Sequence, residues 1–147
     1  MNQLLKMNVS EHITLIEATD SPTAKKLGID NTPNDEQLTC MRILAEHCFE
    51  PLRKWYGKPI HINSFFRSEI LNRAINGKPN SQHLKGEAID ISAGSIEENK
   101  KLFDWIKANL SYDQLIWENG GAWVHVSFTS SKGNRNMSFG ATQIIPK

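Results

Sequence analysis

The sequence lacks the features that mark several large classes of protein. No apolar run in its 147 residues approaches the roughly 18 to 20 that a transmembrane helix needs. Lysine and arginine number 17 against 16 aspartates and glutamates, so no excess charge points to nucleic acid or to an anionic membrane. Internal repeats, a glycine-rich phosphate loop and a heptad pattern are also missing. We therefore expect no nucleic acid partner and no membrane insertion.

Cysteine is scarce, and its spacing argues against a disulfide. Cys40 and Cys48 are eight residues apart in a predicted helix, which separates them by about 12 Å along the axis. The N-terminus has no apolar stretch like the roughly 7 to 15 residues of a secretory signal peptide. We expect a soluble monomer that is made in the cytoplasm.

The length and composition suit one compact domain over residues 1–147. Hydrophobic residues make up 39% and charged residues 22%, as in ordinary globular proteins. We divide the domain into a lead-in segment (1–33), a catalytic core (34–128) and a C-terminal segment (129–147).

Hydrophobic periodicity and capping signals predict the secondary structure. A short helix is expected at 22–27, and a long one after Asn34 that Pro51 should kink or split. Further helices are expected at 68–75 and after Ser95, and strands at 60–64, 88–91, 114–117 and 123–128, the last two as a hairpin. Without a regular βαβ repeat, this order predicts an α+β fold with a small antiparallel sheet flanked by helices.

Three residues are candidates for chemistry by their type and position. His83 lies in a polar loop, Asp90 ends a predicted strand, and His125 lies within the last strong strand. Two imidazoles and a carboxylate can hold a catalytic Zn²⁺ while leaving its fourth position to water. Residue types alone do not establish such a site, because most chains of this size contain two histidines and an aspartate.

The residues around these three resemble a known family. The stretch from Ser81 to Asp90 (SQHLKGEAID) resembles the S-x-H-x-x-G-x-A-x-D signature of the M15 zinc D,D-peptidases, and the WVH that ends at His125 resembles their W-x-H strand. Upstream, SFFRS, which contains Arg67, resembles their S-G-Y-R-S segment. The resemblance runs from about 13 to 128 and is to the branch of this family with D-Ala-D-Ala carboxypeptidases and phage endolysins. It implies a hedgehog/D,D-peptidase-like fold.

This resemblance implies roles for individual residues. His83, Asp90 and His125 would bind one Zn²⁺, and Arg67 would hold the substrate carbonyl oxygen as it becomes an oxyanion. Ser81 matches a serine that helps to hold the terminal carboxylate of the substrate, although turn or capping chemistry is an equal alternative. Trp123 would form a wall of the substrate cleft.

The general base is the first departure from the family pattern. Relatives often carry an acidic residue or a histidine three positions before the last ligand, where this chain has Ala122. Glu118 is the nearest acidic candidate, and we predict that it is the catalytic base. Glu87 is the second candidate.

The register of the predicted hairpin decides whether Glu118 qualifies. If Gly120 and Gly121 form a two-residue turn, Glu118 opposes Trp123 and lies on the face of His125. A turn at residues 119–120 would move Glu118 further from His125, and a three-residue loop would place it on the other face. We favour the first register.

Phe65 is the second departure, because the family pattern usually has glycine at this position. If that glycine needs a positive φ, phenylalanine implies a changed turn and a displaced Arg67.

The resemblance thus implies zinc-dependent hydrolysis of peptide bonds adjacent to D-amino acids in peptidoglycan, by a carboxypeptidase or an endopeptidase. Such an enzyme would be a phage or prophage lysin that reaches the cell wall after its release from the cytoplasm. The alternative is a non-catalytic, zinc-containing protein of the same fold that binds cell wall or belongs to a virion.

Overall fold

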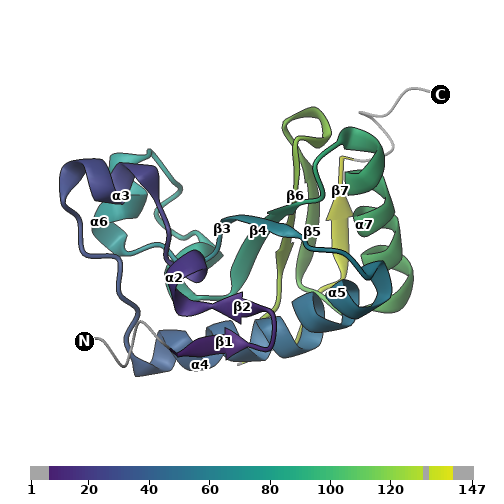
Figure 1. Cartoon of the computed structure of the whole chain (residues 1–147), viewed down its shortest axis with the longest axis horizontal. Helices are drawn as coiled ribbons and strands as arrows, with labels where there is room; N and C mark the ends of the chain where they lie inside the picture. The colour runs from purple at the N-terminus through teal and green to yellow at the C-terminus, as the bar shows by residue number, and fades with distance from the viewer. Residues whose placement is uncertain (1–6, 131–132, 141–147) are drawn as a thin grey trace.

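A computed structural model describes residues 7–130 and 133–140 of the chain (Figure 1). The α-helices are α2 (Leu15–Ala18), α3 (Pro22–Leu27), α4 (Asp35–Leu44), α5 (Glu50–Tyr56), α6 (Glu69–Ala74) and α7 (Ile96–Asn109), with a π-helix η1 (Ala45–Phe49) and 3₁₀ helices η2 (Gln82–Lys85) and η3 (Asn119–Gly121). The strands are β1 (Asn8–Ser10), β2 (Ile13–Thr14), β3 (His61–Ser64), β4 (Ala88–Ser92), β5 (Gln114–Glu118), β6 (Trp123–Ser127) and β7 (Met137–Phe139).

The central sheet has five strands in the order β3-β4-β6-β5-β7. Neighbouring strands are antiparallel except β5 and β7, which are parallel. The predicted α+β fold with a small, mainly antiparallel sheet is therefore confirmed, and the parallel pairing of β5 with β7 is an addition to it. No sequence signal predicted β7, because its three residues alternate too briefly to be recognised without their partner strand.

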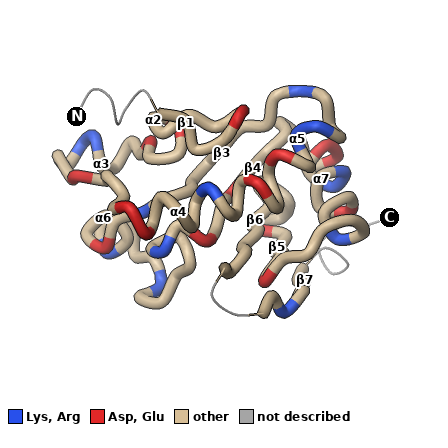
Figure 2. Tube along the Cα trace, turned by 90° about the horizontal axis from the view of Figure 1, so that it is seen from below, with Lys and Arg blue, Asp and Glu red and all other residues tan. Residues whose placement is uncertain are grey.

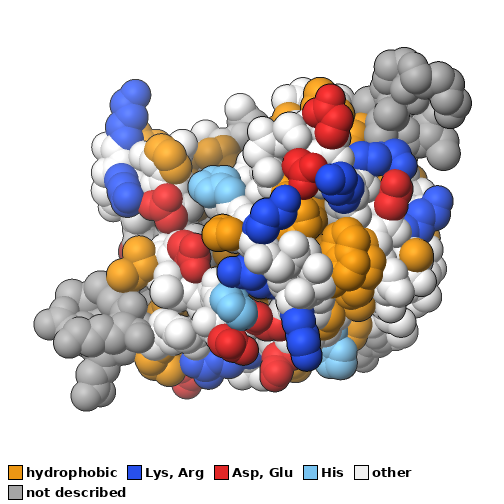
Figure 3. All heavy atoms as spheres, turned by 45° about the vertical axis from the view of Figure 1, so that its right-hand side comes forward, with side chains coloured by type: hydrophobic (Ala, Val, Ile, Leu, Met, Phe, Trp, Pro, Cys, Tyr) orange, Lys and Arg blue, Asp and Glu red, His pale blue; other side chains and the backbone are white. Residues whose placement is uncertain are grey.

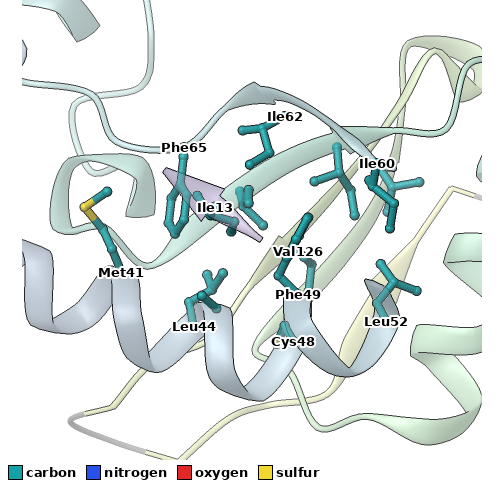
Figure 4. Packing of buried hydrophobic residues seen from close by; sticks show 14 of the residues in the cluster. Ile13, Met41, Leu44, Cys48, Phe49, Leu52, Ile60, Ile62, Phe65 and Val126 are labelled. Atoms are coloured by element: carbon teal, nitrogen blue, oxygen red, sulfur yellow. The ribbon is translucent and has the colours of Figure 1, made fainter. Parts of the chain in front are cut away.

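The core lies between one face of the sheet and the helices. The inward side chains of β4, β6 and β5 are almost completely buried, and they belong to Ile89, Ile91, Val124, Val126, Leu115 and Trp117. The run of α4, η1 and α5 points its apolar side chains at this layer, as Met41, Leu44 and Phe49 do in Figure 4. One face of the sheet is thereby closed, and its other face is left for the site.

Pro51 disturbs the long helix as the sequence predicts, and the structure shows in what form. The turn before it is a π-helix in which Glu50 N–H bonds to the carbonyl of Ala45, and Pro51 lies in the first turn of α5. A proline has no N–H to give to the preceding turn, and a π-turn accommodates this by one extra residue. Apolar residues at three- and four-residue steps from Leu38 to Trp55 predict one buried face for this helix. The extra residue shifts that face, so Trp55 is 46% exposed and Tyr56 packs on the core instead.

Helix caps follow the sequence closely. Asn34 and Gln37 form the predicted capping box of α4. Ser95 caps α7 as expected, but the carboxylate of Glu98 accepts hydrogen bonds from Tyr56 and Lys101 instead of closing a box. Ile96, expected to face inward, is exposed.

Both cysteines are free thiols, as predicted; burial raises the pKa of the Cys48 thiol to about 12.

Charged residues of both signs are interspersed over the molecule. Lysine and arginine alternate with aspartate and glutamate along the helices in Figure 2, and the face in Figure 3 mixes them with exposed hydrophobic side chains. Among the described residues, no helix is both long enough and apolar enough to cross a bilayer.

Candidate metal centre and active-site cavity

The face of the sheet opposite the core carries the candidate site. Asp90 on β4 pairs with His125 on β6, and Glu118 on β5 pairs with Trp123 on β6. Because side chains alternate along a strand, these residues share one face while their neighbours fill the core. Strand alternation therefore brings the four side chains together.

A cavity of about 590 Å³ lies over this face. Every predicted site residue lines it: Arg67, Ser81, His83, Asp90, Glu118, Trp123 and His125. The sequence reasoning missed six further lining residues: Lys78, Asn80, Gln82, Gln114, Ile116 and Arg135. Strand alternation with Glu118 could have identified Gln114 and Ile116.

His83 comes from η2, whose first turn is capped by Ser81. The Ser81 hydroxyl accepts a hydrogen bond from the backbone N–H of His83, which is the capping contact considered as the alternative role of Ser81. Ser81 also lines the cavity. The ring Nδ1 of His83 lies 2.7 Å from the carbonyl oxygen of Phe65, and because a carbonyl only accepts, Nδ1 carries the proton. Its Nε2, with the free electron pair, is buried without a hydrogen-bond partner among the described residues, 3.3 Å from Asp90 Oδ2.

The carboxylate of Asp90 joins the two histidines. Its Oδ1 lies 2.8 Å from His125 Nδ1 and its Oδ2 faces His83 Nε2. Burial alone would raise the pKa of Asp90, but the hydrogen bond with His125 and the two neighbouring imidazoles outweigh it and hold this pKa well below its usual range. The carboxylate is therefore available as an anionic ligand.

These three side chains fit a divalent metal. One ligand atom of each, from His83, Asp90 and His125, lies within 4.8 Å of the others. Two ligands about 2.0 to 2.1 Å from a tetrahedral zinc lie roughly 3.3 Å apart, which matches the distance from Asp90 Oδ2 to His83 Nε2, whereas His125 Nδ1 is hydrogen-bonded to Asp90 Oδ1 at 2.8 Å. The buried electron pair of His83 Nε2 is what a metal would satisfy, and a three-ligand set leaves one position open.

Gly86 allows η2 to lie against α4. It has a φ of +75°, and a Cβ at this position would lie 2.6 Å from the carbonyl oxygen of Gln37 and 2.6 Å from Met41 Cγ. Only glycine combines this backbone conformation with so close an approach. The glycine of the signature thus fixes the position of His83.

Phe65 does not have the left-handed backbone on which the expected change of turn depends. Among the described residues, the non-glycine positions with positive φ are Asn76, Asn119 and Asn136, so Phe65 takes no left-handed conformation. Its side chain is 1% exposed and points into the core (Figure 4), while its carbonyl orients His83. Arg67, two residues later, lines the cavity.

Arg67 lies in the cavity wall, held from two sides. Its backbone N–H donates to the carbonyl of His83 at 3.2 Å, and its Nη1 donates to Asn72 Oδ1 at 3.1 Å. The Asn72 amide in turn donates to the carbonyl of Lys78 at 2.9 Å. Burial lowers the pKa of Arg67 and the charge of Asp90 opposes this shift. Asn72 is a residue of the site that sequence reasoning missed, because no local pattern shows what it contacts.

The hairpin has the favoured register but a different turn. Glu118 opposes Trp123, as predicted, and therefore lies about 7 to 8 Å from His125 between α-carbons as a diagonal neighbour. The connection is the 3₁₀ helix η3, with Asn119 at a φ of 48° and Gly120 at 68°, instead of a two-residue glycine turn. Asn tolerates the left-handed conformation, so the connection begins at Asn119, one residue before the predicted glycine turn.

Glu87, the second candidate base, is buried outside the cavity. Because side chains alternate along the chain that leads into β4, the Glu87 side chain lies with Ile89 on the face of the sheet opposite Asp90. The backbone carbonyl of Glu87 accepts a hydrogen bond from the N–H of Phe128.

An open three-ligand cluster beside an arginine and a glutamate is typical of hydrolases that use a metal ion. Comparison with known families places the chain within this class. Residues 11–127 match the model of the family described as Peptidase M15, and the chain belongs to this family of peptidases, which are generally metallopeptidases. No curated protein matches the chain.

Proposed function

We propose that this peptidase uses zinc to hydrolyse a peptide bond adjacent to a D-amino acid in peptidoglycan. The observation that carries the proposal is the buried Nε2 of His83, which has no hydrogen-bond partner in the described part of the chain and lies beside Asp90 and His125 in the cavity that Arg67 and Glu118 also line. Two imidazoles and one carboxylate are ligands that suit zinc. Peptidoglycan as the substrate is supported by the resemblance of the SQHLKGEAID and WVH segments to the D,D-peptidases.

The residues of the cavity divide the chemistry among them. When bound, the zinc supplies a Lewis acid that polarises the carbonyl and lowers the pKa of a water molecule. Glu118 takes the proton of the attacking water and passes it to the leaving amine. Arg67 donates to the carbonyl oxygen as negative charge develops on it. Ser81 and Trp123 contact the substrate, the serine through its hydroxyl proton and the tryptophan through its ring.

The setting of the activity follows from the same proposal. The substrate lies in the bacterial cell wall, and the enzyme acts there after its release from the cytoplasm, as a phage or prophage lysin does. It works as a monomer on peptide strands and needs neither nucleic acid nor a membrane.

The experiment measures turnover on purified peptidoglycan with zinc-loaded and chelated protein. We expect activity only with metal, about one zinc per chain, and no bound zinc in His83→Ala. Glu118→Gln should retain zinc and thermal stability while turnover falls about 100-fold or more. The control is Glu97→Gln, which removes a solvent-exposed glutamate of α7.

Three outcomes would contradict the proposal. Activity that survives chelation would exclude the metal, and full zinc occupancy in His83→Ala would exclude this ligand set. Binding to peptidoglycan without turnover in any variant would favour the non-catalytic alternative.

A further inference from the structure

A positively charged side chain from the C-terminal segment, that of Arg135, reaches the candidate active-site cavity. Arg135 precedes β7 and lines the cavity together with the predicted site residues. Its side chain is 55% exposed, whereas the carboxylate beside it, that of Asp113, is only 5% exposed. The proposed chemistry assigns no role to this arginine.

Asp113 holds the guanidinium in one orientation. Arg135 Nε donates to Asp113 Oδ1 at 2.9 Å and Nη2 donates to Oδ2 at 2.7 Å, while the backbone N–H of Arg135 also bonds to Oδ1. Hydrogen bonding from Arg135 lowers the pKa of Asp113, which keeps its carboxylate charged. A side-on pair of this kind fixes the plane of the guanidinium as well as its position.

The loop that carries Arg135 is anchored on both sides. The amide of Asn134 exchanges two hydrogen bonds with the backbone of Thr129. Asn136, with a φ of 54°, accepts the N–H of Tyr112 through its side chain, and its own N–H donates to the carbonyl of Tyr112. The arginine is therefore positioned before any ligand arrives, which reduces the entropy cost of binding.

The remaining donors of Arg135 match a carboxylate. The contact with Asp113 uses the edge formed by Nε and Nη2. The edge formed by Nη1 and Nη2 makes no hydrogen bond within the described residues and offers two parallel N–H groups, the geometry of bidentate carboxylate recognition. Lys78, whose side chain is exposed, adds a second cation to the cavity lining.

We propose that Arg135, oriented by Asp113 and assisted by Lys78, binds a carboxylate of the peptide substrate and makes the enzyme prefer anionic peptides to their amides. This inference rests on the proposed function, because it assigns a substrate group to the same cavity. The carboxylate can be the C-terminal one or one on an acidic side chain. Both have the same chemistry, and the experiment separates them.

The experiment uses three synthetic stem peptides: one with both carboxylates free, one amidated at the C-terminus and one amidated at the side chain. For each, kcat/KM is measured with zinc-loaded wild type, Arg135→Gln and Arg135→Lys. The control Lys107→Gln removes one exposed positive charge from α7. Equilibrium affinities of the same peptides are measured by calorimetry.

We expect wild type to prefer the free carboxylate over one of the two amides by about 10- to 100-fold. In Arg135→Gln this preference should almost vanish, while kcat/KM on the less preferred amidated peptide stays within about threefold of wild type. Arg135→Lys keeps an ion pair for Asp113 but lacks the second edge, so it should lose most of the preference and melt close to wild type. The amidated peptide that wild type cuts more slowly shows which carboxylate Arg135 binds.

Other results would overturn the inference. Wild type without a carboxylate preference, or Arg135→Gln with an unchanged one, would exclude the contact. An equal loss on all three peptides would show a purely structural role. If wild type binds the peptides without cutting them, the proposed hydrolysis fails, and the calorimetric affinities decide the anion preference by the same criteria.

Discussion

Replacing Asn72 by alanine should separate the position of Arg67 from the stability of the fold. Asn72 is 2% exposed, accepts a hydrogen bond from Arg67 Nη1 and donates one to the carbonyl of Lys78. The bond to a charged group is worth about 1.5 to 3 kcal/mol and the neutral one about 0.5 to 1.5 kcal/mol. Asn72→Ala should therefore lower the free energy of unfolding by about 2 to 4 kcal/mol, which is roughly 4 to 16 °C in Tm.

The same substitution should reduce turnover more than the loss of stability explains. Without its partner, the Arg67 guanidinium is no longer held toward the substrate, and kcat/KM should fall about 10- to 100-fold, mainly through kcat. The assay is hydrolysis of a stem peptide well below the Tm of the variant. Leu102→Ala is the control, because Leu102 is fully buried in α7 and a comparable core truncation costs about 2 to 5 kcal/mol. Equal kcat/KM in the two variants would refute the positioning role of Asn72.

Two further predictions follow from single contacts. Gly86→Ala should lose about 2 to 3 kcal/mol of stability, because its Cβ would collide with α4, and calorimetry should show zinc binding weakened at least about tenfold. The control is Gly57→Ala, at a φ of +73° with open space around it. This variant should lose only about 1 kcal/mol and bind zinc normally. Arg135 lowers the pKa of Asp113 in the folded protein below the value of about 3.9 that it has in the unfolded chain. The ion pair therefore contributes fully to stability above about pH 3.9, and this contribution is lost as the pH falls through the pKa of the folded state. The difference in urea stability between wild type and Asp113→Asn should thus narrow between pH 6 and pH 3, and a constant difference would contradict the ion pair.

The parts of the fold that sequence predicts best are those decided by neighbours along the chain. Ser21 and Gly28 bound α3, and Asn34 begins α4, because a cap satisfies backbone groups within a few residues. The favoured hairpin register, with Glu118 opposite Trp123, is confirmed, although the predicted two-residue turn is wrong. Such contacts are local, so the sequence contains all the information that they need.

The three candidate metal ligands could be predicted because the segments around them resemble motifs of the M15 peptidases, whereas their residue types alone were not enough. Asp90 and His125 are cross-strand partners, and strand alternation turns both toward the cavity. Arg135 and Asn72 could not be found in this way. Arg135 reaches the cavity through the parallel pairing of β5 with β7 and through its bond to Asp113. Asn72 acts from α6, where it contacts Arg67 and the carbonyl of Lys78. Both depend on long-range packing that no short pattern records.

Phe65 offers the sharpest test of where this chain departs from its relatives. Its side chain is 1% exposed in the core and its backbone is not left-handed, so glycine should be worse at this position than phenylalanine. Phe65→Gly should lose about 4 to 6 kcal/mol, because truncating a buried phenylalanine costs about 3 to 5 kcal/mol and glycine adds roughly 0.5 to 1 kcal/mol. Zinc should still bind at low temperature, since the group that orients His83 is the main-chain carbonyl of residue 65, which the substitution keeps. Thermal unfolding with and without zinc measures both effects, and Phe103→Ala, a buried phenylalanine of α7, calibrates the loss from truncation. An unchanged or higher Tm in Phe65→Gly would mean that phenylalanine strains the backbone here, and the position that we assign to Arg67 would lose its support.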